Sequence, residues 1–242
     1  MEEQHVIITY RLDRTTILEL CAQLDPDLMS AIRHPTGIPP LVQVLSVFHF
    51  LASGSFQTTV AIASGMSQPM FSNVLSRVLS ALLKHMRSYI VFLQVEDLPT
   101  VKGDFYALGH IPNIIGDSGY PNLSWLLTPV RNPRTRAEER YNEAHGQTRR
   151  IIERTFGLLK ARFRYLHLTD GSLFYSPKKV FQIIVACFML HNLALRRQVP
   201  FLQEDGPDGG VVAAVEPVDS EDEEAEEEDI DNRNTVIQQY FQ

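Results

Sequence analysis

The stretch from Asp117 to Arg164 constrains the fold more than any other part of this 242-residue chain. Its second half reads RRIIERTFGLLKARFR and carries apolar residues at helical spacing, at Ile152, Phe156, Leu159, Phe163 and Leu166. Steps of four, seven and eleven residues also bring a charged set to one neighbouring helix face, namely Arg149, Glu153, Lys160 and Arg164. Thr135 and Glu138 are spaced as in a capping box. The pattern predicts a long amphipathic helix with one carboxylate among cations.

A second carboxylate precedes this helix. Asp117 follows the apolar pair Ile114–Ile115, where a short strand can end. Asp117 at the strand end and Glu153 on the helix form a pair of carboxylates. Two such carboxylates can bind one divalent cation together with phosphate oxygens. The arginines and the lysine nearby could bind the phosphates of a nucleic-acid backbone. The alternative is a solvated helix with surface salt bridges and no such site.

The charge of the chain is unevenly distributed. The formal net charge is −7, but residues from Gln203 onward hold fourteen Asp and Glu against one Arg. Residues 1–202 hold twenty-one Lys and Arg against fifteen Asp and Glu, and residues 131–164 alone hold ten against four. We therefore expect a polyanionic partner to bind the central helix. We also expect the acidic tail to compete with that partner for the same basic surface.

The sequence of residues 41–87 predicts three helices, of which the third is longer than the second. The first ends near Gly54, the second runs from Phe56 to Gly65, and the third begins after Ser67 as N-cap with Pro69 in its first turn. A short helix, a glycine turn and a capped longer helix form the helix-turn-helix pattern. The outer face of the third helix would present polar residues that can contact DNA, at Gln68, Ser72, Asn73, Ser76 and Arg77. The alternative is a helical bundle whose polar face meets water.

Other segments have simpler interpretations. We expect one helix within residues 1–34, a helix starting near Asp104, a strand at Tyr165–Asp170 and a helix at Lys178–Arg197. Residues 203–231 are rich in Gly, Pro, Asp and Glu and predict disorder, and Thr235–Gln242 predicts one exposed turn.

Cys21 and Cys187 lie in apolar helical contexts and predict buried thiols in a reducing compartment. His191 is expected to be a hydrogen-bonded structural histidine. No run of eighteen apolar residues is present, so no membrane span is expected.

Two motifs carry a resemblance to a known family. The run from Gly116 to Leu166, with YSPKKVFQIIVACFMLHNLAL after it, resembles the Harbinger transposase-derived nucleases of the Asp-Asp-Glu superfamily. Asp117, Gly119 and Tyr120 match the Asp-x-Gly-Tyr motif that holds the second Asp. Arg149, Glu153 and Lys160 match the Arg-x3-Glu-x6-Lys motif that holds the Glu.

The resemblance implies a function and a fold. It implies hydrolysis of DNA phosphodiesters with Mg²⁺ or another divalent metal, held by Asp117 and Glu153, while Arg149, Lys160 and Arg164 hold DNA. It implies a Myb-like DNA-binding partner protein and a nuclear location, with the cytoplasm as the other possibility. The expected fold is predominantly α: a helical amino-terminal domain with a helix-turn-helix (1–100), an incomplete ribonuclease-H-like α/β domain (101–200) and an acidic disordered tail (201–242).

One departure from the family pattern weakens the expected activity. The family's first catalytic Asp lies on a central strand before the Asp-x-Gly-Tyr motif, but here Gly116 leads directly into Asp117. We interpret this as an internal deletion at that junction. Asp97 or Asp104 would replace the lost carboxylate only if held in a productive position. The chain is therefore predicted to be a weak or inactive nuclease, and the alternative is a non-catalytic module that binds DNA or protein.

Overall fold

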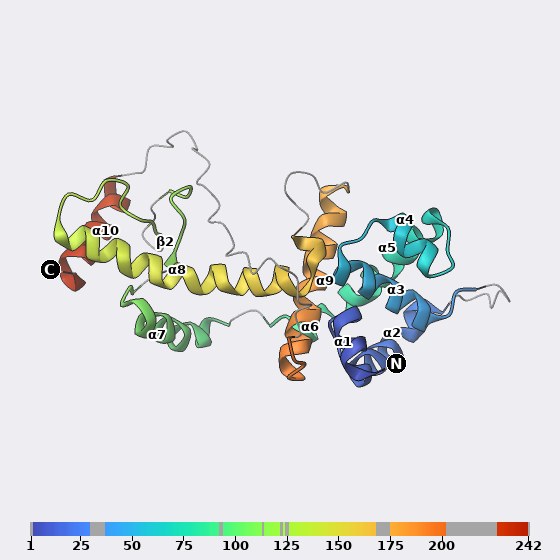
Figure 1. Ribbon diagram of the computed structural model, residues 1–242. Helices are drawn as coiled ribbons and strands as arrows, with labels where there is room; N and C mark the ends of the chain where they lie inside the picture. Colours follow the sequence, from blue (N-terminus) through green and yellow to red (C-terminus); the bar gives the residue numbers. More distant parts are fainter. Residues whose placement is uncertain are drawn as a thin grey trace. The chain divides into compact units, whose positions relative to one another are not determined.

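The computed structural model describes residues 2–29, 37–91, 94–112, 114–121, 123, 126–167, 175–201 and 227–241 (Figure 1). These residues are mostly helical, as predicted. Contacts divide the chain into unit 1 (Met1–Val91 with Gly157–Gly209) and unit 2 (Phe92–Phe156 with Gly210–Gln242). The units do not follow the predicted domain ranges, because the helix after residue 177 packs with the amino-terminal helices. The domain boundaries themselves stay a prediction.

Unit 1 is built from helices. In chain order they are α1 (Glu3–Tyr10), α2 (Arg14–Leu28), α3 (Pro40–Ser53), α4 (Gln57–Ala63), α5 (Gln68–Lys84), α6 (Met86–Tyr89), the last turns of α8 (Arg136–Arg162), the 3₁₀ helix η2 (Arg164–Leu166) and α9 (Pro177–Arg196). Local signals explain their ends. The side chain of Asp13 accepts a hydrogen bond from the backbone N–H of Thr16 and caps α2. The side chain of Ser67 accepts a hydrogen bond from the backbone N–H of Met70 and caps α5. Gly54 ends α3 with φ 68°, a left-handed conformation that favours glycine.

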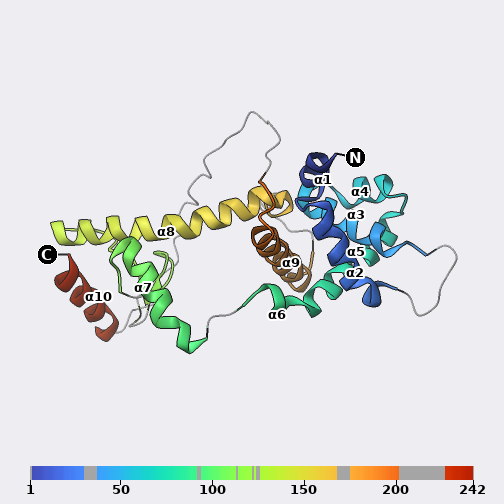
Figure 2. The same cartoon turned by 90° about the horizontal axis from the view of Figure 1, so that it is seen from below.

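The core of unit 1 lies between α2, α3, α5, η2 and α9 (Figure 2). Phe48, Phe50 and Phe71 are at most 2% exposed, and Phe163 brings the end of α8 into the same core. Full burial of one such side chain stabilises a fold by about 1.5–3 kcal/mol. The three helices predicted in residues 41–87 are present as α3, α4 and α5, while their role as a DNA-binding motif stays a prediction.

Helix α9 is the longest apolar helix of unit 1. It is long and apolar enough to cross a membrane, but half of its most apolar window is buried within the protein. It packs against α5 and α6, and Ile183, Cys187 and Leu190 are at most 2% exposed. A core helix meets the same criterion of length and composition, and we interpret α9 as one. The predicted burial of Cys21 and Cys187 is confirmed.

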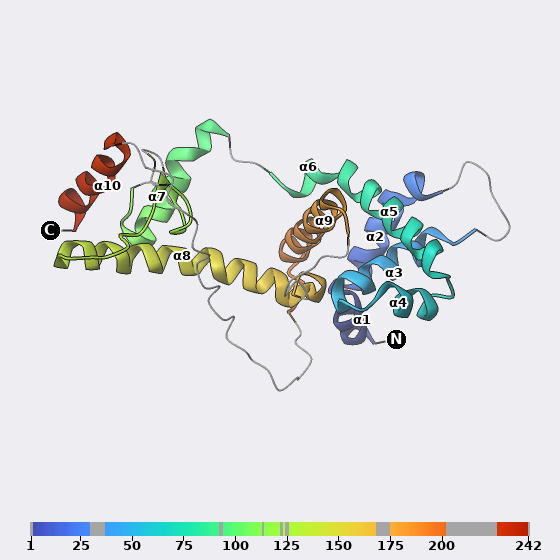
Figure 3. The same cartoon turned by 90° about the horizontal axis from the view of Figure 1, so that it is seen from above.

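Unit 2 contains a small second core (Figure 3). Its elements are the 3₁₀ helix η1 (Val95–Asp97), α7 (Leu98–Gly109), β1 (Ile114–Ile115), β2 (Leu126–Leu127), residues Arg136–Phe156 of α8 and α10 (Glu227–Tyr240). The strands are parallel, with Ile114 opposite Leu126 and Ile115 opposite Leu127. Among the described residues this pair is the whole sheet, so the ribonuclease-H-like architecture stays a prediction.

Four local expectations were wrong. The amino-terminal region forms two helices, because Arg11 at φ 63° ends α1 before Asp13 caps α2. Helix α7 begins at Leu98 rather than near Asp104. Arg164 to Leu166 form a 3₁₀ helix rather than the start of a strand, so Arg164 lies beyond the end of α8.

The fourth correction concerns the carboxyl terminus. Thr235 to Tyr240 belong to the fourteen-residue helix α10, and Val236 and Ile237 are buried rather than exposed. Phe241 contacts the ring of Tyr141 on α8, and Tyr240 contacts the ring of Tyr106 on α7. The apolar face of α10 thus has a partner, which the short apolar run alone could not reveal. The prediction of disorder for residues 203–231 was wrong for residues 227–231, which form the start of α10, and residues 203–226 lie outside the described residues.

Candidate metal and nucleic-acid site

Asp117 lies directly after β1, as the sequence predicted. The backbone N–H of Gly116 donates to the carbonyl of Leu127 at 2.8 Å and continues the pairing of β1 with β2. The carboxylate of Asp117 then accepts the backbone N–H of Ser118 at 2.6 Å, and its carbonyl accepts the N–H of Tyr120 at 3.0 Å. These bonds form a tight turn in which the carboxylate is held at the strand end.

One face of α8 holds the segment after β2. The hydroxyl of Tyr141 donates to the carbonyl of Thr128 at 3.0 Å. Asn142 exchanges two bonds with the backbone of Val130, at 2.8 and 2.9 Å. One turn later, Nε2 of His145 lies 3.3 Å from the carbonyl of Leu127. The helix is therefore fixed in register with β2, and the next residue on this face is Arg149.

His145 is an uncharged part of this contact. It is 2% exposed, and burial lowers the pKa of its imidazole, against the opposing effect of bonds to the backbone of Leu127 and Gly116. Because a carbonyl oxygen only accepts, Nε2 is the protonated nitrogen that donates to Leu127. Burial likewise raises the pKa of Tyr141, so this phenol remains protonated.

Arg149 joins the two predicted metal ligands. Its Nη1 and Nη2 donate to the two carboxylate oxygens of Asp117 at 2.7 and 3.0 Å. Its Nε lies 2.8 Å from Oε1 of Glu153, one turn further along α8. The side chains of Asp117, Arg149 and Glu153 are 41%, 34% and 52% exposed, so the cluster is open to solvent. The structure therefore brings Asp117 and Glu153 to one cation, but that cation is a guanidinium.

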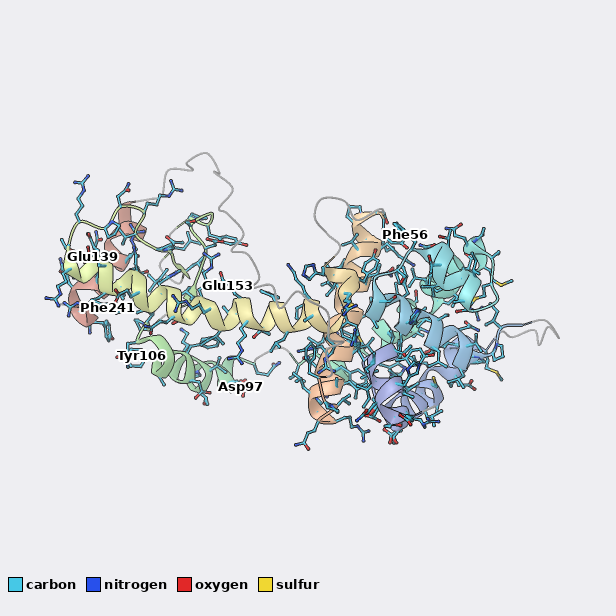
Figure 4. All side chains as sticks on the ribbon, viewed as in Figure 1. Phe56, Asp97, Tyr106, Glu139, Glu153 and Phe241 are labelled. Atoms are coloured by element: carbon cyan, nitrogen blue, oxygen red, sulfur yellow. The ribbon has the colours of Figure 1, made fainter. Side chains whose placement is uncertain are left out.

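A third metal ligand is not found beside them. Among the described residues, no three Asp, Glu, His or Cys side chains gather in an arrangement that could hold a metal ion. Asp97 lies at the start of α7, where its carboxylate accepts the N–H of Gln94, and Figure 4 shows it on a different element from Glu153. Asp104 lies within α7. As arranged, the residues present do not fit Mg²⁺, because Arg149 binds both carboxylates.

The remaining residues predicted to contact DNA belong to unit 1. Lys160 lies two turns beyond Glu153 on α8 and is half-buried, and Arg164 is exposed in η2. On α5, Gln68 and Asn73 are exposed, but Gln68 donates to the side chain of Gln57 at 3.0 Å.

Arg77 has a structural partner on a neighbouring helix. Its Nη2 donates to the carbonyl of Leu28 at the end of α2. Lys179 of α9 donates to the hydroxyl of Ser76 at 2.6 Å, which adds an unpredicted cation to this face. The exposed face of α5 therefore keeps its polar character, while Arg77 is committed within unit 1.

Sequence reasoning did not assign the roles of Tyr141, Asn142 and His145. The signal available was their spacing, because Tyr141, His145 and Arg149 follow one another at four-residue steps. The predicted capping box is present: Thr135 accepts the N–H of Glu138 at 3.2 Å, and Glu138 accepts the N–H of Thr135 at 3.0 Å. His191 is buried, as a structural histidine would be, and its Nδ1 has no hydrogen-bond partner among the described residues.

The segment that holds this site also matches a family of known proteins. The family profile described as "DDE superfamily endonuclease" matches residues 86–192, a range that includes Asp117, Arg149 and Glu153. The protein named "Putative nuclease HARBI1" from Bos taurus is 28% identical over 272 positions, covering 80% of this chain and 78% of that protein. Its counterpart from Rattus norvegicus is 27% identical over 309 positions, covering 95% and 87%.

Over most of its length this chain resembles the Harbinger transposase-derived nucleases. A shorter stretch is similar to the protein named "Antagonist of like heterochromatin protein 1" from Arabidopsis thaliana. It is 31% identical over 100 positions, covering 40% of this chain and 24% of that protein. No solved structure matches the chain.

Proposed function

We propose that this chain is a Harbinger-derived nuclease relative in which the metal-dependent active site is incomplete, so that it hydrolyses DNA weakly or not at all. The observation that carries the proposal is the arrangement of its carboxylates. Asp117 and Glu153 both bind Arg149, and the described residues supply no third metal ligand beside them. In the family's chemistry a divalent cation activates the attacking oxygen and offsets charge on the phosphate. Two carboxylates alone hold Mg²⁺ weakly.

An internal deletion at the Gly116–Asp117 junction explains the missing carboxylate. The alignment with the rat protein runs over 309 positions, which is more than the 242 residues of this chain. Eighty per cent of 242 residues is about 194, which leaves about 78 of the 272 positions in the bovine alignment without a residue from this chain. A loss of that length fits the absence of the central strands of a ribonuclease-H-like sheet. Sequencing transcripts of the locus tests whether Gly116 is joined directly to Asp117.

Cleavage is tested on supercoiled plasmid DNA. The purified chain with Mg²⁺ or Mn²⁺ is expected to give no more nicked circles than a buffer control. Nicking that depends on the metal and disappears in Glu153→Ala would contradict the proposal. Glu143→Ala, which removes an exposed carboxylate from the same helix, serves as the matched control for the loss of one negative charge, because Glu143 is outside the contacts of Arg149 with Asp117 and Glu153.

A non-catalytic binding module is the second candidate function. Residues 131–164 hold ten Lys and Arg against four Glu, which favours a polyanion such as DNA. We propose nuclear DNA as the ligand and a Myb-like DNA-binding protein as the partner protein. Strong binding to a DNA duplex that weakens steeply with salt, without cleavage, would favour this role. Binding that is insensitive to salt would count against it.

A further inference from the structure

The guanidinium of Arg149 uses three of its nitrogens on the two carboxylates. Nη1 and Nη2 form a paired contact with both oxygens of Asp117, at 2.7 and 3.0 Å. Nε is directed at Glu153, 2.8 Å away. Such paired arginine–carboxylate contacts are among the stronger charge-assisted hydrogen bonds. Arg149 therefore lies where a cation shared by Asp117 and Glu153 would have to bind.

A divalent metal and this guanidinium compete for the same oxygens. Mg²⁺ requires oxygen ligands at about 2.1 Å in near-octahedral geometry, so it needs carboxylate lone pairs that Arg149 now occupies. Arginine cannot give up its proton at any ordinary pH, and its positive charge repels an approaching Mg²⁺. With one positive charge among two negative charges, the cluster keeps a net charge of only −1 to attract a metal.

We propose that Arg149 replaces the divalent cation in this chain, holding Asp117 and Glu153 together and closing the remnant of the metal site. The inference deepens the proposed function, because it assumes that Asp117 and Glu153 descend from the metal ligands. The paired hydrogen bonds that Arg149 donates to Asp117 also connect α8 with the end of β1.

The opposing interpretation is an ordinary surface ion pair. The three side chains are between one third and one half exposed, and exposed ion pairs typically contribute only about 0–1 kcal/mol. In that case Arg149 would swing into solvent when a metal arrives, and its removal would not change metal affinity. The two interpretations therefore differ in one measurable quantity, the affinity for a divalent cation with and without the guanidinium.

Isothermal titration calorimetry with Mn²⁺ alone and with Mg²⁺ alone measures this affinity on the full chain. Arg149→Gln is expected to bind at least about tenfold more tightly than the wild type. Arg150→Gln, the neighbouring cation, is expected to bind like the wild type. Adding Glu153→Gln to the Arg149→Gln variant is expected to abolish the gain. Arg149→Lys keeps the charge but not the paired contact, so an intermediate affinity is expected from a variant that disturbs the turn less.

Two results would overturn the inference. One is a wild-type affinity equal to that of both Arg149 variants, and the other is no metal binding by any of them when circular dichroism shows each to be folded. The plasmid assay distinguishes this failure from failure of the proposed function. Metal binding by Arg149→Gln without nicking supports the inference and leaves the proposed function intact. Nicking by the wild type contradicts the proposed function whatever the calorimetry shows.

Discussion

Gly116 has little room for a side chain at the turn into Asp117. A Cβ atom there would lie 3.1–3.3 Å from three carbons of the Leu126 side chain, closer than ordinary van der Waals contact. Leu126 belongs to β2, and its side chain would have to shift by a few tenths of an ångström to accept the new Cβ. We expect Gly116→Ala to destabilise unit 2 by about 1 kcal/mol or more, as other overpacking substitutions do.

Urea denaturation followed by tryptophan fluorescence measures this effect, because the chain's single tryptophan, Trp125, lies in the sequence range of unit 2. Gly119→Ala is the matched control. A Cβ at Gly119 meets nothing within 4 Å, so a change within about 0.5 kcal/mol is expected. Equal effects of the two substitutions would show that the contact with Leu126 has no energetic consequence.

His145 makes the stability of unit 2 depend on pH. Its pKa in the folded chain is lowered from the ordinary value of 6.5 by burial, so the unfolded chain binds its proton more readily. Stability from this residue is therefore complete above about pH 6.5 and falls as the pH drops through that value towards the folded-state pKa. Unfolding midpoints measured between pH 8 and pH 5 are expected to decrease in this direction.

Replacing His145 by Gln isolates its contribution. The amide can still donate to the carbonyl of Leu127 but does not titrate in this range. The difference in unfolding free energy between wild type and variant is expected to shrink as the pH falls. A difference that stays constant across the range would mean that His145 is not the titrating group.

Helix α10 completes the core of unit 2. Val236, Ile237 and Phe241 are at most 8% exposed and pack with Tyr141, and the guanidinium of Arg233 donates to the carbonyl of Pro129 at 3.4 Å. Figure 4 shows Phe241 beside the amino-terminal half of α8. We expect Phe241→Ala to cost about 3 kcal/mol in the stability of unit 2, by removing a buried ring.

The same denaturation experiment measures the role of α10. Gln239→Ala changes an exposed residue of the same helix and is expected to leave stability nearly unchanged. Increased binding of a hydrophobic dye by the Phe241 variant would indicate that the surface around Tyr141 has opened. Unchanged stability in the Phe241 variant would show that α10 contributes little to this core.

The apolar stripe of α8 is buried only along part of its length. Leu159 and Phe163 are at most 3% exposed in the core of unit 1, whereas Ile152 and Phe156 are 38% and 47% exposed. An amphipathic helix is expected to bury its apolar face, but the half of this face that falls in unit 2 is exposed. An exposed stretch of a core-type helix face is what loss of neighbouring strands would leave.

The whole molecule combines a basic body with an acidic carboxyl-terminal region. Residues 1–202 carry a formal charge of +6, and the rest carries −13. Replacing the acidic residues of 216–226 by Ser or Asn leaves the sequence of α10 unchanged. The replacement removes negative charge that would compete with DNA for the Lys and Arg side chains of residues 1–202. We expect the variant to bind duplex DNA more tightly than the wild type at low salt, with the difference shrinking as salt rises.

Fluorescence anisotropy of a labelled duplex over a series of salt concentrations measures this difference. A variant of the same length in which Gly206, Gly209 and Gly210 are replaced by Ser, with all acidic residues kept, controls for a change in chain flexibility. Identical affinities for the wild type and the neutralised variant would show that the acidic region does not compete with DNA.

Local patterns predicted most of the helices. The strand at Ile114–Ile115, the capping box at Thr135 and Glu138, and α3, α4 and α5 follow from neighbouring residues, because caps, turns and periodic apolar residues act over a few positions. The motifs also identified Asp117, Arg149 and Glu153 as one group, which the structure brings together. Their roles towards metal and DNA remain predictions.

The sequence by itself thus determined the helical character, the resemblance to a nuclease family and the residues of the candidate site. Tertiary structure alone decided which partner each of these residues takes. Arg149 binds Asp117 because β1, β2 and the Tyr141–His145 face of α8 hold it there, and α10 is buried because the core around Tyr141 accepts it. Such contacts join residues far apart in the chain, so their energies depend on the packed arrangement rather than on local pattern.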